Sequence, residues 1–380
     1  WHADKAIEKT MQKNKGWKDE ERGFVADTVY DIVRNWRLLG SLVATDSEIL
    51  QGDLWSILGA WLVMRNHEIP ICSQLKAVNQ KKIMERLDRF HRVRKIRESV
   101  PDWLDSLGEK ELGAEWDNVI HSLNKPPRIY LRTNTLKTSR EELIQMLLQE
   151  HIVANPAGLA PGAIELTEHK NVFRTEAFRK GLFEVQDAAS QQVSILLDVQ
   201  PGMRVIDACA GAGGKTLHLA ALMQNKGRII ALDNIAWKLD ELRKRASRAG
   251  ANIIETKVTE NSKVVKRLKN TADRLLLDVP CSGLGVLRRN PDTKWKLSAE
   301  YIDKIKIVQQ DILVKFSQLV KAGGKMVYAT CSILPSEGEA QINLFLQKQD
   351  TTWKLLEEKR TSPHTSFADG FYMALLERSK

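Results

Sequence analysis

From residue 186 onward, short apolar strand segments alternate with helix-like segments, and this alternation limits the possible folds more than any other feature. The expected strands are RVIDACA, RIIALD, RLLLDV and KMVYAT, with one more near residues 252–256. The expected helices are AASQQVSILLDV, WKLDELRKRASRAG and IDKIKIVQQDILVKFSQLV, with another after GAGGKT. Such alternation is typical of a parallel sheet that is covered by helices on both faces. We therefore predict an α/β, Rossmann-like domain over residues 186–380.

Two smaller domains are expected before this sheet. Residues 1–123 have the apolar periodicity of helices and predict an all-helical N-terminal domain. The paired prolines of NKPPRIYLRTNTLK break any helix, and RIYLRTN is typical of a strand. A helix candidate, SREELIQMLLQE, follows with Ser139 and Glu142 in capping-box spacing. The sequence therefore predicts a small α+β module over residues 124–185.

The positive charge of the chain is concentrated in its later part. Residues 1–125 hold 20 Lys and Arg against 20 Asp and Glu, so the net charge of +10 falls within residues 126–380. This bias favours a polyanionic partner, because bases that neutralise phosphates release counterions, although an inert basic surface has the same charge. The longest apolar run, WSILGAWLVM, is too short to span a bilayer, and no secretion signal is recognisable. We expect a cytoplasmic monomer with no membrane contact.

Four cysteines, Cys72, Cys209, Cys281 and Cys331, are spread along the chain. They form no CxxC pair and no Cys/His cluster with zinc spacing. We therefore expect individual thiols and no metal site.

The stretch VIDACAGAGGKT is a strand followed by a glycine-rich turn, and glycines there let the backbone approach a ligand closely. A phosphate loop would need glycine where Cys209 stands, and the dinucleotide pattern would need glycine where Thr216 stands. Asp207 precedes the turn, and Asp233 ends the next strand, where an acid can bind a ribose diol. The pattern indicates an adenosine ligand without a phosphate clamp, hence S-adenosylmethionine; a turn that uses glycine only for packing is the alternative.

The expected cofactor-binding residues are the two acids, the turn itself and one further acid at a strand end. Cys209 is expected to be a small wall residue of this site. The complete set is Asp207, Cys209, Ala210, Gly211, Ala212, Gly213, Gly214, Lys215, Asp233 and Asp278.

Two cysteines follow two other strands. In LLLDVPCSG, Asp278 ends a strand and Cys281 lies just beyond it, and in KMVYATCS a later strand is followed by Cys331. Because ligands bind at the carboxyl ends of parallel strands, these residues should share one edge of the sheet with the cofactor turn. A lone cysteine in such a place is usually inert, but two beside a carboxylate and a cofactor turn favour chemistry.

The segments DACAGAGGKT, DVPCSGLGVLRRNPDTKW and TCSILPSEGE resemble three motifs of the Sun-type RNA (cytosine-5) methyltransferases. LRTNTLK, FEVQDAASQ and DGFYMALLER fit the same family, so that the likeness spans about residues 126–380. The N-terminal part is similar to a short form of the NusB-like domain of the bacterial small-subunit rRNA members. The resemblance implies a class I methyltransferase domain, S-adenosylmethionine as cofactor, and RNA as partner, with rRNA favoured and tRNA as the alternative.

The same resemblance implies roles for the catalytic residues Cys331, Cys281 and Asp278. The Cys331 thiolate would add to C6 of cytosine so that C5 can attack the methyl group, and Cys281 would assist release. Asp278 would stabilise charge at N3 of the base. A non-catalytic RNA-binding protein with a methylase fold is the rival hypothesis, and it predicts the loss of one of these residues.

Further expectations concern the surroundings of the two thiols. The small module and the segment RRNPDTKW are expected to hold RNA around an unstacked base. Trp295 would stack on a base or simply pack. Relatives usually carry an acid after the third strand, where this chain has Thr259 and then Glu260, and a proline where it has Ala212. The candidates for a positive field at the thiols are Lys215, Arg288, Arg289 and Lys294.

Overall fold

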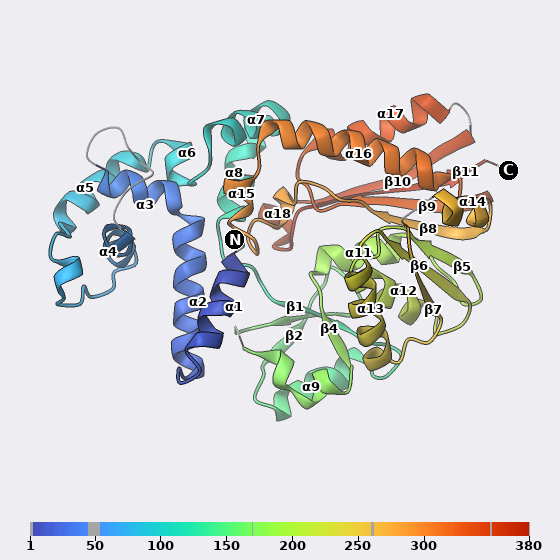
Figure 1. Ribbon diagram of the computed structural model, residues 1–380, viewed down its shortest axis with the longest axis horizontal. Coiled ribbons are helices and arrows are strands. Elements are labelled where there is room, and N and C mark those ends of the chain that lie inside the picture. Colours follow the sequence, from blue (N-terminus) through green and yellow to red (C-terminus); the bar gives the residue numbers. More distant parts are fainter. Residues whose placement is uncertain (1–2, 45–53, 169, 260–261, 350–351, 380) are drawn as a thin grey trace. The chain divides into compact units, whose positions relative to one another are not determined.

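The computed structural model describes residues 3–44, 54–168, 170–259, 262–349 and 352–379. The chain forms two compact units (Figure 1). The helical unit comprises Trp1–Pro126 and Leu287–Ala299, and the α/β unit comprises Pro127–Val286 and Glu300–Lys380. The segment Leu287–Ala299 therefore groups with the helical unit, although it lies in the sequence between two strands of the large sheet.

The helical unit contains only helices and turns in the part that the structure describes, which confirms the predicted all-helical region. Its core is built from Leu39, Leu42, Ala60 and Trp61, which are almost fully buried. The helices are α1 (Ala3–Lys13), α2 (Asp19–Arg34), α3 (Trp36–Val43), α4 (Leu54–Met64), α5 (Gln80–Phe90), α6 (Arg94–Arg97), α7 (Asp102–Leu112), α8 (Trp116–Leu123) and α15 (Thr293–Lys296), with short 3-10 turns at Ser73–Leu75 and Gly113–Glu115.

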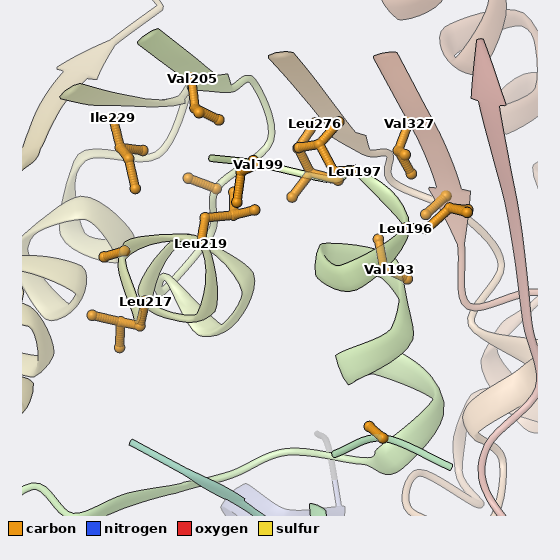
Figure 2. Packing of buried hydrophobic residues seen from close by; sticks show 14 of the residues in the cluster. Val193, Leu196, Leu197, Val199, Val205, Leu217, Leu219, Ile229, Leu276 and Val327 are labelled. Atoms are coloured by element: carbon orange, nitrogen blue, oxygen red, sulfur yellow. The ribbon is translucent and has the colours of Figure 1, made fainter. Parts of the chain in front are cut away.

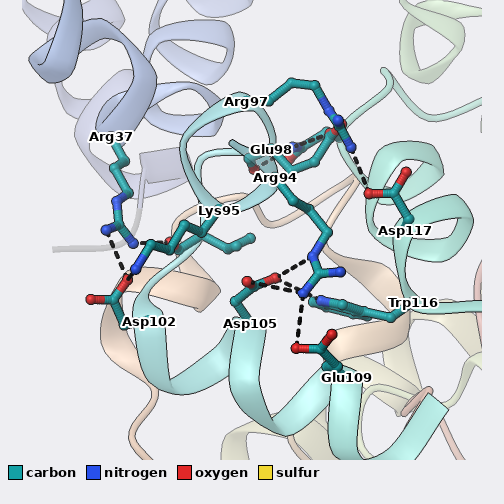
Figure 3. Close-up of polar contacts among 12 residues, drawn as sticks. Arg37, Arg94, Lys95, Arg97, Glu98, Asp102, Asp105, Glu109, Trp116 and Asp117 are labelled. Carbon is teal, nitrogen blue, oxygen red and sulfur yellow. Dashed lines mark hydrogen bonds and ion pairs between the residues drawn. The ribbon is translucent and has the colours of Figure 1, made fainter. Parts of the chain in front are cut away.

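The bases of α6 are ion-paired inside the helical unit (Figure 3). Each of them contacts an acid on α7 or α8, and Arg37 of α3 shares one of these acids. The ion pairs are Arg94–Asp105 at 2.8 Å, Lys95–Asp102 at 3.0 Å, Arg97–Asp117 at 2.6 Å and Arg37–Asp102 at 2.8 Å. These bases thus connect the helices of the unit to one another.

The small module at the start of the α/β unit is a four-stranded antiparallel sheet in the order β2-β3-β1-β4. The predicted capping box begins helix α9, since Ser139 Oγ accepts the Glu142 amide at 3.2 Å. Leu131, Leu143 and Phe183 fill its core. The elements are β1 (Tyr130–Thr133), α9 (Arg140–Gln149), β2 (Ala154–Pro156), β3 (Ala163–Leu166), a 3-10 turn (Val172–Arg174), α10 (Glu176–Arg179) and β4 (Phe183–Val185). The predicted α+β module is confirmed.

The large sheet has the strand order β10-β11-β9-β8-β5-β6-β7. The strands from β9 to β7 are parallel, as predicted, and β11 runs antiparallel to both β9 and β10. The strands are β5 (Arg204–Asp207), β6 (Arg228–Asp233), β7 (Ile254–Val258), β8 (Ala272–Asp278), β9 (Val320–Thr330), β10 (Trp353–Thr361) and β11 (Phe371–Arg378). The helices are α11 (Ala188–Leu196), α12 (Gly214–Leu222), α13 (Ala236–Ala249), α14 (Ser262–Leu268), α16 (Ala299–Ser317), α17 (Glu339–Gln349) and α18 (Pro363–Ser366), with 3-10 turns at Leu284–Val286 and Pro335–Glu337.

Both faces of the large sheet are buried. Val205 and Leu276 point to one face, where they pack with Leu219 of α12 (Figure 2). Ile206 and Leu277 point to the other face and pack with residues of α14, α16 and α17. This alternation explains the continuous apolar runs of the strands and confirms the predicted Rossmann-like α/β fold. In the described part of the chain, no helix has the length and apolar character that crossing a membrane requires.

Candidate active site

The predicted acids gather at the carboxyl edge of the large sheet. In the pairing of β5 with β8, Asp207 lies beside Leu276, and Leu276 precedes Asp278 by two residues. In the pairing of β8 with β9, Asp278 lies beside Ala329. The loops that follow these strands carry Cys281 and Cys331. The pairing of the parallel strands thus brings the cofactor turn and both thiols to one edge.

A cavity of about 310 Å³ opens beside the turn after β5. Of the predicted cofactor residues, eight line it and two, Gly213 and Asp233, do not. Four further residues that were not predicted also line the cavity: Arg245, and Val185, Gln186 and Ser190 of the segment FEVQDAASQ. The complete lining is Val185, Gln186, Ser190, Asp207, Cys209, Ala210, Gly211, Ala212, Gly214, Lys215, Arg245 and Asp278.

Asp233 does not line the cavity but holds the glycine turn in place by hydrogen bonds. Its Oδ2 accepts the Gly211 amide at 2.8 Å, and its Oδ1 accepts the Ile235 amide at 2.9 Å. Gly211 has φ +54° and Gly213 has φ +88°, a region that glycine adopts without strain. A Cβ on Gly213 would lie 2.5 Å from Cγ of Leu242 in α13, so only glycine fits there.

The turn offers the chemistry that the predicted cofactor needs. No neighbouring atom lies within 4 Å of a Cβ built on Gly211 or Gly214, so the backbone there faces open space. Backbone amides, carboxylates and the amide of Gln186 surround the cavity and suit the hydroxyl, amino and carboxylate groups of an adenosyl amino acid. The residues present therefore fit S-adenosylmethionine.

Asp207 is buried under the turn, with 1% of its surface exposed. Its Oδ2 accepts the hydroxyl of Thr216 at 2.7 Å. Burial, with a smaller contribution from the charge of Asp278, raises the pKa of Asp207 to about 7. Burial and the same carboxylates raise the pKa of Cys209, so this thiol stays neutral at physiological pH. A neutral thiol that lines the cavity fits the predicted role of Cys209 as a wall residue.

Arg132 of β1 connects the small module to the cofactor turn. The side chain is almost completely buried and donates to Gln186 Oε1 and to the carbonyl oxygen of Gly214. Burial lowers the pKa of this guanidinium to about 9. This role was not predicted, although Arg132 belongs to the quoted segment LRTNTLK.

Lys215 provides the positive charge next to Asp278. Its Nζ lies 2.6 Å from Asp278 Oδ2, and the ammonium also lies 5.2 Å from the centre of the Phe371 ring. The ion pair is largely shielded, since 11% of the lysine side chain and 30% of the aspartate side chain are exposed. Lys215 is thus one of the four predicted bases and contacts an acid of this site.

The other three predicted bases belong to the helical unit. Arg288 Nε donates to the Ser122 carbonyl at 2.9 Å, and the fully buried Lys294 Nζ donates to the Arg34 carbonyl at 2.7 Å. Arg289 lies in the same segment. Trp295 Nε1 donates to the Val33 carbonyl at 2.8 Å, which indicates packing rather than base stacking. Their described partners thus give Arg288, Lys294 and Trp295 structural roles inside the helical unit.

The two predicted catalytic sulfurs are neighbours. Sγ of Cys281 and Sγ of Cys331 lie 3.2 Å apart, and both are free thiols. The hydrogen bond with Cys331, together with burial, raises the pKa of Cys281. At this separation either thiol can donate the hydrogen bond to the other. In the described residues no group of three or more His, Cys, Asp or Glu side chains could hold a metal ion.

Glu337 ties the two cysteine loops together. Its carboxylate is fully buried and accepts the Ser282 amide at 2.9 Å, the Ser332 hydroxyl at 2.6 Å and Nε2 of Gln309 at 2.9 Å. Ser282 and Ser332 directly follow the two cysteines. Glu337 was not predicted as a site residue, although it lies in the segment TCSILPSEGE that carries one of the family motifs.

The chain has Thr259 and then Glu260 after the third parallel strand, where the family usually carries an acid. The Thr259 amide donates to the carbonyl of Asp233 at 3.0 Å, and Glu260 lies outside the described residues. The role of an acid at this position stays a prediction.

Comparison with known proteins identifies the family. The model of 16S rRNA methyltransferase RsmB/F matches residues 194–377, and a ferredoxin-like domain model of RsmF/B-like methyltransferases matches residues 100–173. The probable ribosomal RNA small subunit methyltransferase B of Synechocystis sp. is 32% identical over 430 residues, which cover 100% of this chain and 96% of that protein. Ribosomal RNA small subunit methyltransferase B of Yersinia pseudotuberculosis is 33% identical over 280 residues, 72% of this chain and 65% of that protein.

Solved structures share the fold of this chain. The crystal structure of PH0851 has a TM-score of 0.82 and 27% identity, covering 98% of this chain and 93% of that one. NSun6 from Pyrococcus horikoshii has a TM-score of 0.68 and 22% identity, covering 74% of this chain and 98% of that one, and supports the fold alone. On the full-length match to the Synechocystis relative, together with the fold and the paired thiols, the chain belongs to the RsmB/F family of 16S rRNA methyltransferases.

Proposed function

We propose that this chain transfers a methyl group from S-adenosylmethionine to C5 of a cytosine in small-subunit rRNA, through a covalent bond between Cys331 and C6. The observation that supports this chemistry best is the 3.2 Å separation of the Cys281 and Cys331 sulfurs at the edge that carries Asp278. Family membership supports RNA methylation. The fit of the cavity supports the cofactor, which when bound would supply an activated methyl group.

The first step activates the base. The Cys331 thiolate adds to C6 and forms an S–C6 bond, while the electron pair of the C5–C6 double bond makes C5 nucleophilic. The negative charge that develops at N3 is stabilised by a hydrogen bond that the carboxyl group of Asp278, in its protonated form, donates at the base edge. Lys215, whose Nζ lies 2.6 Å from Asp278 Oδ2, keeps that side chain in position.

The second step restores the aromatic ring. Once C5 carries the methyl group, its proton leaves to a nearby base, and the released electron pair re-forms the C5–C6 double bond and expels the Cys331 thiolate. Cys281 lies beside the departing sulfur and can hand its proton to it, because the two thiols already share a hydrogen bond. Cys281 therefore assists release and does not attack the base.

The test compares wild type, Cys331→Ala and Cys281→Ala with labelled methyl donor and separate small-subunit rRNA and tRNA. We expect 5-methylcytidine in rRNA from wild type, no product from Cys331→Ala, and a denaturation-resistant protein–RNA adduct from Cys281→Ala. Cys72→Ala is the matched control, since Cys72 is a free cysteine of the helical unit. An active Cys331→Ala enzyme overturns the mechanism, a tRNA product supports the tRNA alternative, and RNA binding by wild type without any product supports a non-catalytic role.

A further inference from the structure

A second concavity, of about 210 Å³, lies on the α14 face of the large sheet. Arg204 is the first residue of β5 and Arg228 is the first residue of β6, so the concavity reaches the amino ends of these strands. The carboxyl end of β5, at Asp207, is about 10 Å away at 3.3 Å per residue. The lining consists of Arg204, Arg228, Ile230, Lys257, Val264, Arg267, Leu268 and Thr271. Four of these eight residues are cations, and none is an acid.

Two of the four cations are paired with one acid among the described residues, and the other two are not. Glu255 is ion-paired with Arg228 and also with Lys257, at 2.8 Å for the lysine. These two cations lower the pKa of Glu255, so it stays ionised and occupied. The side chains of Arg204 and Arg267 have no hydrogen-bond or ion-pair partner among the residues that the structure describes. Two guanidinium groups are therefore available to a ligand.

The helix beside the concavity adds further positive charge. Lys263, Lys266 and Arg267 of α14 are exposed, and Lys269 follows the helix in an exposed position. The sequence has no Asp or Glu from residue 262 to residue 272. This cluster accounts for part of the +10 charge that lies beyond residue 125.

Grouped cations of this kind repel one another, and a hollow with low-dielectric walls concentrates their field. The arrangement is most favourable when an anion with several oxygen atoms occupies the hollow. Guanidinium groups match phosphate oxygens in geometry as well as in charge.

We propose that this concavity binds phosphates of the RNA substrate at a distance from the target base. The proposal rests on the proposed function in one respect, namely that RNA is the substrate. The cofactor turn and the thiols lie at the opposite end of the strands, so the same RNA must extend around the sheet to reach both places. The site then contributes affinity for a long or folded RNA and does not contribute to the methyl transfer step.

The experiment measures RNA binding at 50 to 200 mM salt for wild type and for the double variant Arg204→Gln/Arg267→Gln. The matched control is Lys304→Gln/Lys348→Gln, which removes the same charge from α16 and α17, where both lysines are exposed and have no ion-pair partner among the described residues. The probes are a small-subunit rRNA transcript and a short single-stranded RNA that contains one cytosine. Competition with inorganic phosphate distinguishes a site for RNA from one for free phosphate.

We expect the Arg204→Gln/Arg267→Gln variant to bind the transcript about tenfold more weakly, because its phosphate contacts are lost. The slope of log K against log salt should also become shallower, by roughly 0.7 to 0.9 for each lost contact. The control should match wild type, and methylation at saturating RNA should stay unchanged in both variants. Arg267→Gln alone, on the exposed face of α14, replaces the double variant if the latter does not fold. Equal affinities and salt slopes for the variant and the control would overturn the proposal. It would also be overturned if millimolar inorganic phosphate lowered RNA binding by wild type as much as the substitutions do, while RNA did not compete with phosphate for the concavity.

Failure of the proposed function gives a different result. In that case wild type binds the transcript but makes no 5-methylcytidine, and the effect of the arginine substitutions on binding can still be measured.

Discussion

The carboxylate of Glu337 accepts a 2.6 Å hydrogen bond from the hydroxyl of Ser332, and the same carboxylate accepts the amide of Ser282 at 2.9 Å. Each serine directly follows one of the two predicted catalytic cysteines. In addition, the amide of Gly285 donates to the carbonyl of Cys331 at 2.9 Å. The two thiols are therefore held at their short separation by a buried polar network rather than by the strands alone.

Glu337→Gln should lower kcat by about one to two orders of magnitude and leave KM for RNA nearly unchanged. A glutamine places an NH₂ donor against one of three donors, which leaves a buried group unpaired at a cost of about 1–3 kcal/mol. Reaction of the unliganded protein with a dithiol-specific arsenical reports the sulfur separation without any turnover. Glu339→Gln, two residues away and paired with Arg360, is the control. Unchanged dithiol capture by the Glu337 variant would contradict a positioning role.

Lys215→Met should reduce kcat by roughly 10²- to 10⁴-fold, the range typical of a group that supports proton and charge transfer at the base. The substitution removes the ammonium 2.6 Å from Asp278 but retains an apolar stem against Phe371. Single-turnover methylation measures the effect, and thermal unfolding checks that the fold persists. Lys226→Met, an exposed lysine without a described ion pair, should behave like wild type. Full activity of Lys215→Met would exclude a role at Asp278.

The pKa of about 7 at Asp207 predicts a pH dependence of stability. Because the folded-state pKa lies above the unfolded value of 3.8, this group stabilises the unliganded protein fully below about pH 4, and the contribution is lost as the pH rises through 7. The shift corresponds to about 4 kcal/mol. Between pH 5 and pH 8 the unfolding midpoint of wild type should therefore fall further than that of Asp207→Asn. Parallel pH profiles for the two proteins would show that Asp207 does not titrate in this range.

Gly213→Ala should weaken cofactor binding by at least tenfold. The new Cβ would lie 2.5 Å from Cγ of Leu242, and φ at Gly213 is +88°, so the turn must shift. Gly202→Ala is the matched control, because Gly202 has φ +91° but no atom within 4 Å of a built Cβ. Calorimetric titration with S-adenosylmethionine measures both variants. Equal affinity for the two variants would contradict the requirement for glycine at position 213.

Lys294→Met should destabilise the helical unit by about 2–4 kcal/mol. The lysine ammonium donates to the carbonyl of Arg34 at 2.7 Å and to Oδ1 of Asn124 at 3.0 Å, and these two acceptors would lose their donor. Hydrogen exchange in α2 and α8 reports this change. Lys296→Met, two residues away and paired with Asp292 on the surface, should change protection little. Unchanged protection of α2 and α8 from hydrogen exchange in Lys294→Met would contradict the structural role of this lysine.

The sequence by itself determined the alternation of strands and helices, because apolar periodicity and turn residues act over a few neighbouring positions. It also indicated the shared edge of Asp207, Asp278, Cys281 and Cys331, since the carboxyl ends of parallel strands meet wherever the strands pair. The capping box at Ser139 was equally local.

Only the tertiary structure decided which side chains meet across long stretches of chain. Four features depend on partners far away in sequence: the placement of Lys294 in the helical unit, the antiparallel strands β10 and β11, the lining residue Arg245, and the network of Glu337. Burial determines these roles, because a polar group removed from water must find a partner, and the identity of that partner is set by the packing of the whole unit.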